Sequence, residues 1–325
     1  MGARFLHSIA KPLTAFVAGA FPTFDLPVNP LSLVLLNLEI TRANPAAGAV
    51  YKAVDDLLDN VTSVIIKHKG ENIISGALKD LLIVNMLNGE SKIGWSNLTD
   101  VSGAVSRFCI PLCFGRKKYD PNECFPATSR GNLTLDIVRA ANPASFSALS
   151  IQVETVELIE ANPTQYLKYT PNAQTAVVGS FDQALPIGNK YLRLVFFDTG
   201  LATLTTGVSS WGQVKLLKDN VEQYYPLSDA QTLAAYLMSQ IESDGVFPGH
   251  RHQTVTAVGA GVFTDEADEA ASKGVRGYFS MDFDPNGDDM YAMETAGAAD
   301  IKVRALGASA TAVRVTPVEL VAVKK

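Results

Sequence analysis

The sequence predicts an all-β protein with two inserted helices, built as two tandem eight-stranded antiparallel jelly rolls. Short segments of alternating polarity are separated by turns rich in the 24 glycines and 16 prolines of the chain, which is typical of antiparallel sheets. The same order of strands and helix occurs twice. A parallel sheet would need a helix between most strands. Halves of roughly 140–160 residues suit an eight-stranded jelly roll.

Composition excludes several classes of protein. The chain of 325 residues is 47% hydrophobic and 18% charged, so it can bury a core and is not a disordered chain. No stretch reaches the roughly 18–20 consecutive apolar residues that cross a bilayer as a helix. A formal net charge of −6 argues against binding to nucleic acid through phosphate neutralisation, so no specific nucleic acid is expected as a partner.

Residues 1–25 are expected to form an N-terminal arm. No acidic residue occurs before Asp25, and basic and apolar side chains alternate in a way that suits an anionic lipid surface. The residues expected to face a membrane are Arg4, Phe5, Ile9, Lys11 and Phe16. A secretory signal, or an arm packed on a neighbouring subunit, explains the segment as well. Pro12 excludes one long helix, so a bent or extended segment is expected.

The predicted strands of the two halves correspond in order. Each half has a strand before its helix, a strand that leads into an Asp-Pro-Asn turn, an alternating strand, and a last strand that ends in Val-Glu-Leu. In the first half they are Val61–Lys67, Arg107–Phe114, Asn132–Val138 and Ile151–Leu158. In the second half they are Trp211–Leu217, Arg276–Phe283, Asp300–Leu306 and Val313–Leu320. This ordered repetition indicates a duplicated domain.

One helix is predicted in each half. Helical spacing of apolar residues predicts a helix over Ile73–Leu87 and a second over Asp229–Ser243. Ser228 and Gln231 form a capping-box pattern at the start of the second helix. Leu81 and Leu237 lie on the two apolar stripes. Both helices are therefore expected to be core elements.

The joint between the halves is expected at Asn162-Pro163, because Asn-Pro favours turns. The first jelly roll then covers residues 26–162 and the second covers residues 163–325. The only long insertion that the pattern shows is the loop from Phe247 to Arg276.

No motif in the chain indicates chemistry, so no catalytic, cofactor-binding or metal site is expected. Asp282–Asp288 begins like a calcium loop, but Met293 stands where the bidentate glutamate belongs. A turn explains this segment better, and calcium stays as the alternative. His250 and His252 are interpreted as a loop pair. The cysteines, Cys109, Cys113 and Cys124, are interpreted as core thiols, and pairing of the last two stays open.

Two successive jelly rolls, each with a helix in one long connection, resemble the double jelly-roll major capsid proteins of the adenovirus and tectivirus lineage. The likeness covers about residues 26–325 and is greatest to the capsid proteins of icosahedral, membrane-containing bacteriophages. The resemblance implies a major capsid protein that forms the icosahedral shell as homotrimeric, pseudo-hexameric capsomers.

The resemblance also implies partners and a location. The partners would be further copies of the chain in the trimer and in neighbouring capsomers, penton and minor capsid proteins, and an internal lipid membrane contacted through the arm. The protein would be assembled in the host cytoplasm and would reside in the capsid shell of the virion. A secreted or cell-surface carbohydrate-binding β-sandwich is the alternative, and it would need an exposed aromatic platform at Trp95 or Trp211. An enzyme is the third class.

Overall fold

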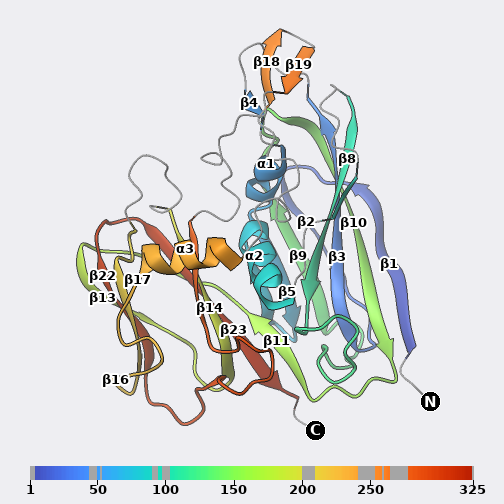
Figure 1. Ribbon diagram of the computed structural model, residues 1–325. Coiled ribbons are helices and arrows are strands. Elements are labelled where there is room, and N and C mark those ends of the chain that lie inside the picture. The colour runs from blue at the N-terminus through green and yellow to red at the C-terminus, as the bar shows by residue number, and fades with distance from the viewer. Residues whose placement is uncertain are drawn as a thin grey trace. The chain divides into compact units, whose positions relative to one another are not determined.

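The computed structural model describes residues 4–43, 50–51, 53–89, 94–96, 103–199, 209–240, 253–257, 260–263 and 277–323. The chain forms two compact units (Figure 1). The first comprises Met1–Leu167, Asp244–Gly274 and Val323–Lys325, and the second comprises Lys168–Ser243 and Val275–Ala322. The chain passes from the first to the second within β11 (Gln165–Tyr169). Within the described ranges, every helix is too short or too polar to cross a membrane.

The first unit contains two antiparallel sheets. In one, the strand order is β1 (Arg4–Ala15), β10 (Phe146–Ile159), β3 (Leu31–Arg42), β8 (Val105–Cys113) and β7 (Gly94–Ser96). In the other, it is β2 (Gly19–Asp25), β9 (Leu133–Arg139), β5 (Ser63–His68) and β6 (Glu71–Gly76). Alternating apolar side chains of these strands, such as Leu36, Ile66, Ile110 and Leu135, are almost completely buried.

The second unit repeats this arrangement. In one set of strands, the order is β12 (Asn172–Thr175), β23 (Ala312–Ala322), β14 (Lys190–Asp198) and β20 (Tyr278–Asp282), with β21 (Met293–Glu294) also on β14. In the other, it is β13 (Gly179–Ala184), β22 (Ile301–Gly307), β15 (Gln213–Lys218) and β16 (Val221–Glu222), with β17 (Ser228–Asp229) also on β15.

The two strand orders are the same, which confirms the predicted duplication. The order β1-β10-β3-β8 corresponds to β12-β23-β14-β20, and β2-β9-β5-β6 corresponds to β13-β22-β15-β16. All eight segments predicted as strands overlap one of these strands, with ends that differ by up to five residues. Each unit thus has two antiparallel sets of four strands, and these eight strands form one jelly roll. The chain therefore contains two jelly rolls, as the sequence predicts.

The first predicted helix begins later than expected. Helix α2 spans Leu78–Gly89, whereas Ile73 and Ile74 belong to β6, where Ile74 pairs with Ile66 of β5. Apolar neighbours at positions 73 and 74 fit a strand buried on both faces as well as a helix, so periodicity could not place the boundary. A further helix, α1 (Ala53–Asn60), was not predicted, because its amphipathic pattern lasts only eight residues.

Helix α3 spans Ala230–Gln240, close to the predicted range. Asp229 is its N-cap: its Oδ1 accepts a hydrogen bond of 2.9 Å from the backbone N–H of Thr232. The N-cap therefore lies one residue after the predicted Ser228. Ser228 and Asp229 form β17 and pair with Val214 and Gln213 of β15, so the helix begins directly after this pairing ends.

An aromatic cluster occupies the core of the second unit. The rings of Phe196 and Phe279 stack with centroids 4.4 Å apart, and Trp211 meets the edge of Phe196 at 5.1 Å. All three side chains are inaccessible to solvent. Such aromatic contacts add to the free energy gained by burying the rings.

Part of the predicted long insertion belongs to the first unit. Strands β18 (Gln253–Ala257) and β19 (Ala260–Phe263) form a hairpin, and β18 pairs with β4 (Val50–Tyr51). Figure 1 shows this small sheet at the top of the view, above α1. His250 and His252 lie outside the described residues.

The repeated Val-Glu-Leu triplet has a structural reason. In the first unit, Nδ2 of Asn29 donates a hydrogen bond of 2.7 Å to buried Glu157, and in the second, Nδ2 of Asn189 donates one of 2.6 Å to buried Glu319. Asn29 lies two residues before the central strand β3, and Asn189 lies directly before the central strand β14. In both units, the hydrogen bond thus holds the residues just before the central strand against the last strand.

We expect Asn29→Ala and Asn189→Ala each to lower the free energy of unfolding by about 1.5–3 kcal/mol, because each removes a hydrogen-bond donor from a buried carboxylate. Urea denaturation measures the loss, with exposed Asn286→Ala as the control. A loss no larger than that of the control in both variants would contradict the assigned role.

Candidate functional site

The N-terminal strand β1 forms an edge of the first sheet. It pairs only with β10, from Arg4 opposite Ile159 to Ala15 opposite Ser150, with register shifts on either side of Lys11. The second shift, between Lys11 and Thr14, contains Pro12, which has no N–H to donate to a ladder. The segment is extended, as Pro12 predicts. None of the side chains from Arg4 to Ala15 is buried.

Two of the five residues expected to face a membrane carry exposed apolar side chains. Phe5 is 65% exposed and Ile9 is 59% exposed. The ring of Phe5 contacts the edge of the Tyr119 ring at 5.4 Å. Four residues apart on a strand, Phe5 and Ile9 fall on the same face.

The two basic residues of the set have intramolecular partners. Arg4 lies 3.8 Å from Glu160, and both side chains are exposed. The Lys11 ammonium lies 5.8 Å from the centre of the Phe21 ring. Exposed ion pairs contribute little to stability, so the Arg4 guanidinium can exchange Glu160 for an anion in solution or on a surface.

Phe16 differs from the rest of the set, because it is only 2% exposed. Its ring meets the edge of Phe21 at 5.3 Å, and the guanidinium of Arg139 lies 5.5 Å from its centre. In this structure Phe16 is therefore a core residue, and it does not contribute to the exposed surface of β1.

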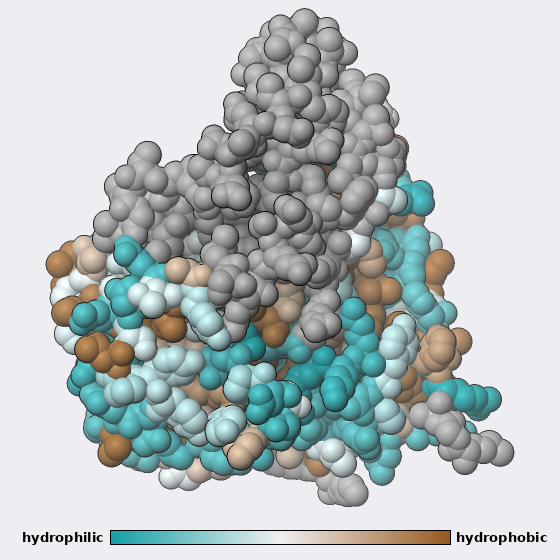
Figure 2. All heavy atoms as spheres, in the orientation of Figure 1, coloured by the Kyte–Doolittle hydropathy of each residue, from teal (hydrophilic) through white to brown (hydrophobic). Residues whose placement is uncertain are grey.

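This segment exposes further apolar side chains, which were not among the residues predicted to face a membrane. We define the N-terminal apolar surface as Phe5, Leu6, Ile9, Leu13 and Val17, which are 43–73% exposed. Hydrophobic atoms are visible on the side of the molecule where β1 lies (Figure 2). Leu6 falls on the face of β1 opposite to Phe5 and Ile9. Exposed apolar side chains gathered on one segment indicate a contact surface for a protein or a membrane. The apolar composition of residues 5–17 is the feature of the sequence that could have predicted this surface.

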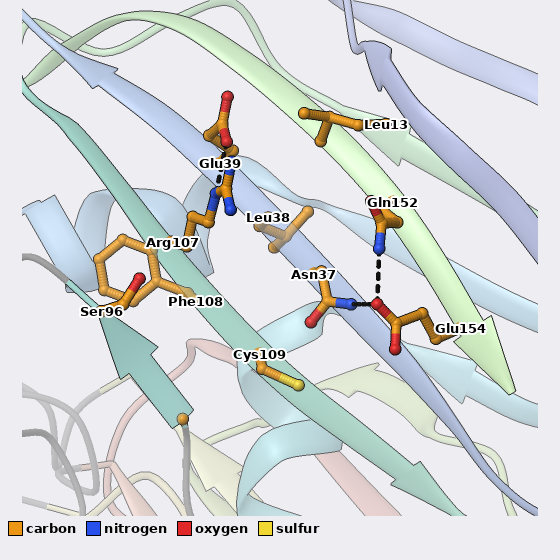
Figure 3. Close-up of a pocket in the computed structure, with 11 residues that line it drawn as sticks. Leu13, Asn37, Leu38, Glu39, Ser96, Arg107, Phe108, Cys109, Gln152 and Glu154 are labelled. Carbon is orange, nitrogen blue, oxygen red and sulfur yellow. Dashed lines mark hydrogen bonds and ion pairs between the residues drawn. The ribbon is translucent and has the colours of Figure 1, made fainter. Parts of the chain in front are cut away.

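A pocket of about 390 Å³ lies on the same sheet. Leu13, Asn37, Arg107 and Cys109 contribute to its lining (Figure 3). Its charged groups are paired internally. The Arg107 Nε donates to Glu39 at 2.6 Å, and the carboxylate of Glu154 accepts hydrogen bonds from Asn37 at 2.8 Å and from Gln152 at 2.5 Å.

His7 of β1 completes the surroundings of Glu154, with its Nε2 2.6 Å from Oε2 of that carboxylate. Glu154 is thereby occupied on both oxygens. His7, Asn37 and Gln152 thus hold this carboxylate within its own sheet. The network fixes the outer face of the sheet.

The cysteines are free thiols. Cys113 and Cys124 are buried, as expected for core thiols, whereas Cys109 is half-buried and lines the pocket. Burial, with a smaller effect of Glu154, raises the pKa of Cys109 to about 11. Burial raises the pKa of Cys124 to about 12. Reactive cysteines have lowered values instead.

We expect Cys109 of the folded protein to react with iodoacetamide at pH 7 about a hundredfold more slowly than an ordinary thiol, because only the thiolate attacks and the pKa lies two units above 9.0. Mass spectrometry of tryptic peptides measures the rate, with the urea-unfolded chain as the reference. Equal rates for the folded and unfolded chains would contradict the raised pKa.

The calcium-like segment Asp282–Asp288 uses its carboxylates within the chain. Asp282 accepts hydrogen bonds from the Arg193 side chain at 2.5 Å and from the Asp284 N–H at 2.9 Å. Asp284 in turn accepts from the N–H of Asp289 at 2.9 Å. These are turn interactions. In the part of the chain that the structure describes, no group of three or more candidate ligands could hold a metal ion.

The aromatic platform that a sugar-binding surface needs is not formed by Trp211, which is completely buried. Its indole Nε1 donates to the Phe197 carbonyl at 3.4 Å. The side chain of Trp95 lies outside the described part of the chain. Trp211 is therefore a core residue of the second unit.

No family model matches the sequence, and no curated protein matches it. Solved structures match it over nearly its whole length. The crystal structure of the major capsid protein P2 from bacteriophage PM2 aligns with a TM-score of 0.59 at 10% identity, covering 100% of this chain and 99% of that one. The major capsid protein of STIV (Sulfolobus Turreted Icosahedral Virus) aligns with a TM-score of 0.64 at 13% identity, covering 98% and 97%.

A third similar structure is the Faustovirus major capsid protein, with a TM-score of 0.52 at 8% identity, covering 99% of this chain and 90% of that one. At these identities the comparison concerns the fold. The repeated strand order of the two units and these end-to-end alignments agree. The chain has the double jelly-roll fold of these viral major capsid proteins.

Proposed function

We propose that this protein is a major capsid protein that forms the icosahedral shell of a virus and resides in the virion. The observation that carries the proposal is the duplication: two jelly rolls of one strand order form the main sheets of both units, and major capsid proteins align with the chain from end to end. A structural rather than catalytic role agrees with the paired carboxylates of the pocket and with the protonated thiol of Cys109.

The duplication also supports a particular capsomer. Each chain has two similar jelly rolls, so three copies have six. A trimer with threefold symmetry can therefore have a nearly hexagonal outline and contact six neighbouring capsomers in similar ways. Closed cyclic symmetry of this kind is common in homo-oligomers. We therefore propose a homotrimer that contacts neighbouring capsomers as well as penton and minor capsid proteins.

The native mass tests the capsomer. We expect light scattering to give three times 34.8 kDa, and negative-stain images to show particles with a pseudo-hexagonal outline. A monomer at every concentration up to that which supports assembly would overturn the trimer. Round particles without six lobes would overturn the pseudo-hexamer.

We further propose that the virus contains an internal membrane and that the N-terminal apolar surface contacts it. Phe5 and Ile9 expose apolar side chains, while Arg4 and Lys11 supply positive charge beside them. Apolar burial and attraction to anionic lipids act together at a membrane surface. A single copy would bind weakly, and repetition over a shell would make the attachment multivalent.

Vesicle flotation tests this contact. The assembled protein is mixed with phosphatidylcholine vesicles that contain phosphatidylglycerol. We expect Phe5→Ser with Ile9→Ser to weaken binding by roughly tenfold or more per side chain, since burial of each contributes about 1.5–3 kcal/mol. Val178→Ser with Val221→Ser, which changes exposed residues of the second unit, should bind as the unchanged protein does. Equal binding by both double variants would overturn the assignment to β1.

A further inference from the structure

The connection from β8 to β9 carries an exposed basic segment beside the start of β1. Residues 116–118 are the only three consecutive basic residues in the sequence. Lys117, Lys118 and Tyr119 are exposed, whereas Arg116 is only partly accessible and pairs with buried Glu123. We define the basic loop as Lys117, Lys118 and Tyr119. Figure 1 shows the connection at the lower end of the first unit, where β1 begins.

The chain on both sides of the basic loop is held in place. The N–H of Phe114 donates to the Ser32 carbonyl at 3.0 Å, and the N–H of Tyr119 donates to the Ser32 hydroxyl at 2.9 Å. After the loop, Phe125 and Leu31 exchange backbone hydrogen bonds of 2.8 and 2.9 Å. The basic loop is therefore presented in a fixed position, so little conformational entropy is lost when it binds a partner.

The two lysines are not neutralised by a neighbouring acid. Neither Lys117 nor Lys118 has an ion-pair partner among the residues that the structure describes. The acids of the same connection have other partners: Glu123 accepts from Arg116, and Oδ1 of Asp120 accepts from the backbone N–H two residues further on at 2.8 Å. Two adjacent exposed positive charges without a counter-charge attract a negatively charged partner.

Tyr119 places an aromatic ring beside these charges. It is 49% exposed, and its ring meets the Phe5 ring in an edge-to-face arrangement with centroids 5.4 Å apart. The backbone φ of Tyr119 is 65°, in the left-handed region that residues with a Cβ rarely adopt. Such conformations are common where a loop binds a partner. The basic loop and the exposed ring of Phe5 thus form one surface that is both cationic and aromatic.

We propose that the basic loop binds the headgroups of anionic phospholipids, with Lys117 and Lys118 at the lipid phosphates and Tyr119 beside Phe5 in the membrane interface. The inference rests on the membrane contact proposed above and adds a lipid class to it. Basic side chains next to apolar and aromatic ones bind anionic membranes. Tyrosine suits the headgroup level, because its ring is apolar and its hydroxyl is polar.

Nucleic acid also offers phosphates, and the observations favour lipid over it. The formal net charge of −6 opposes binding to a nucleic acid through its phosphates. The exposed apolar side chains of Phe5 and Ile9 have no partner on a phosphate backbone, whereas a bilayer buries them. A membrane therefore satisfies both the charges and the apolar side chains of this end of the first unit.

Vesicle flotation of the full chain tests the lipid class. Lys117→Gln with Lys118→Gln is compared with Lys215→Gln with Arg304→Gln, which removes the same charge from the surface of the second unit. The vesicles are phosphatidylcholine with or without phosphatidylglycerol, at low salt. With phosphatidylglycerol, we expect the first variant to bind roughly tenfold or more weakly, since each lysine near an anionic surface contributes about fivefold. The control should bind as the unchanged protein does.

On pure phosphatidylcholine, we expect the unchanged protein and both double variants to bind alike. Equal binding of both double variants to the vesicles with phosphatidylglycerol would overturn the inference. If Phe5→Ser with Ile9→Ser weakens binding and the lysine variant does not, the contact through β1 stands and the inference fails. If the unchanged protein binds neither kind of vesicle, the membrane contact itself fails, and the inference fails with it.

Amide hydrogen exchange locates the contact in the unchanged protein and does not depend on a variant. We expect exchange in peptides that cover residues 116–119 to slow when vesicles with phosphatidylglycerol are added, and not with pure phosphatidylcholine. Protection only in other parts of the chain would overturn the inference. Protection of this segment by double-stranded DNA, with none from vesicles, would overturn the assignment to lipid.

Discussion

Leu81→Ala is expected to lower the free energy of unfolding by about 2–5 kcal/mol, and Leu237→Ala by an amount near the lower end of the same range. Both side chains are buried, at 0% and 1% exposure. Their surroundings differ. Leu81 belongs to α2, in which Leu78, Leu82, Ile83 and Val84 are also inaccessible, so the site has little freedom to collapse around a cavity.

The close approach of β6 to α2 increases the cost at Leu81. A Cβ atom added at Gly76 would lie 3.3 Å from Cδ2 of Leu81, so the strand and the helix are already in tight contact. In α3, by contrast, Leu233 and Ala234 are only partly buried. A helix with an exposed side can move toward the sheet and fill part of the space that Leu237 leaves.

Urea denaturation with an aromatic fluorescence signal measures both losses. Val178→Ala, at a side chain that is 74% exposed, is the control and should change stability little. If Leu81→Ala unfolds at the same urea concentration as the control, α2 is not the core element that the sequence and the structure indicate.

Arg116→Ala is expected to lower the free energy of unfolding by about 3–5 kcal/mol, because it leaves a buried carboxylate without its counter-charge. Arg116 and Glu123 have side chains 15% and 5% exposed, and Nη2 lies 2.6 Å from Oε2. Glu123 also accepts from the backbone N–H of Arg116 at 2.6 Å and from Gln165 at 3.2 Å. The pair therefore closes the whole loop that follows β8.

A double-mutant cycle with Glu123→Gln separates the pair from other effects of truncation. We expect the double variant to lose less than the sum of the single variants. Arg304→Ala, which breaks the exposed bidentate pair with Asp182, is the control and should cost far less, since water replaces the lost partner. Equal losses for Arg116→Ala and Arg304→Ala would show that burial of Glu123 does not determine the effect.

The strands were the most predictable part of the fold. Strict alternation along Asn132–Val138 and Asp300–Leu306 appears in the structure as β9 and β22, because the side chains of a strand alternate between core and solvent whatever their partner is. The helix boundary at Ile73 was not predictable in this way. A short apolar run fits the spacing of a helix as well as that of a buried strand. Only the pairing with β5 assigns Ile73 and Ile74 to β6.

In the N-terminal segment too, some features follow from the local sequence and others only from contacts with distant strands. Its basic and apolar composition and the effect of Pro12 are local properties, and they predict an extended segment with apolar side chains. Its pairing with β10, more than 130 residues away, is not local. Neither is the burial of Phe16 under Arg139, so a residue that resembles its exposed neighbours in sequence belongs to the core.

The sequence by itself determined the all-β class, the duplication and the position of most strands. Alternation and turn residues are local patterns, and the repeated order of segments can be read along the chain. Only the tertiary structure decided which polar groups are paired. Asn29 meets Glu157 and Arg116 meets Glu123, whereas buried Arg139 contacts the neutral Asn142 side chain and the Phe16 ring. The free energy of such a group depends on burial and on partners brought together by the fold, and neither is visible in the residues beside it.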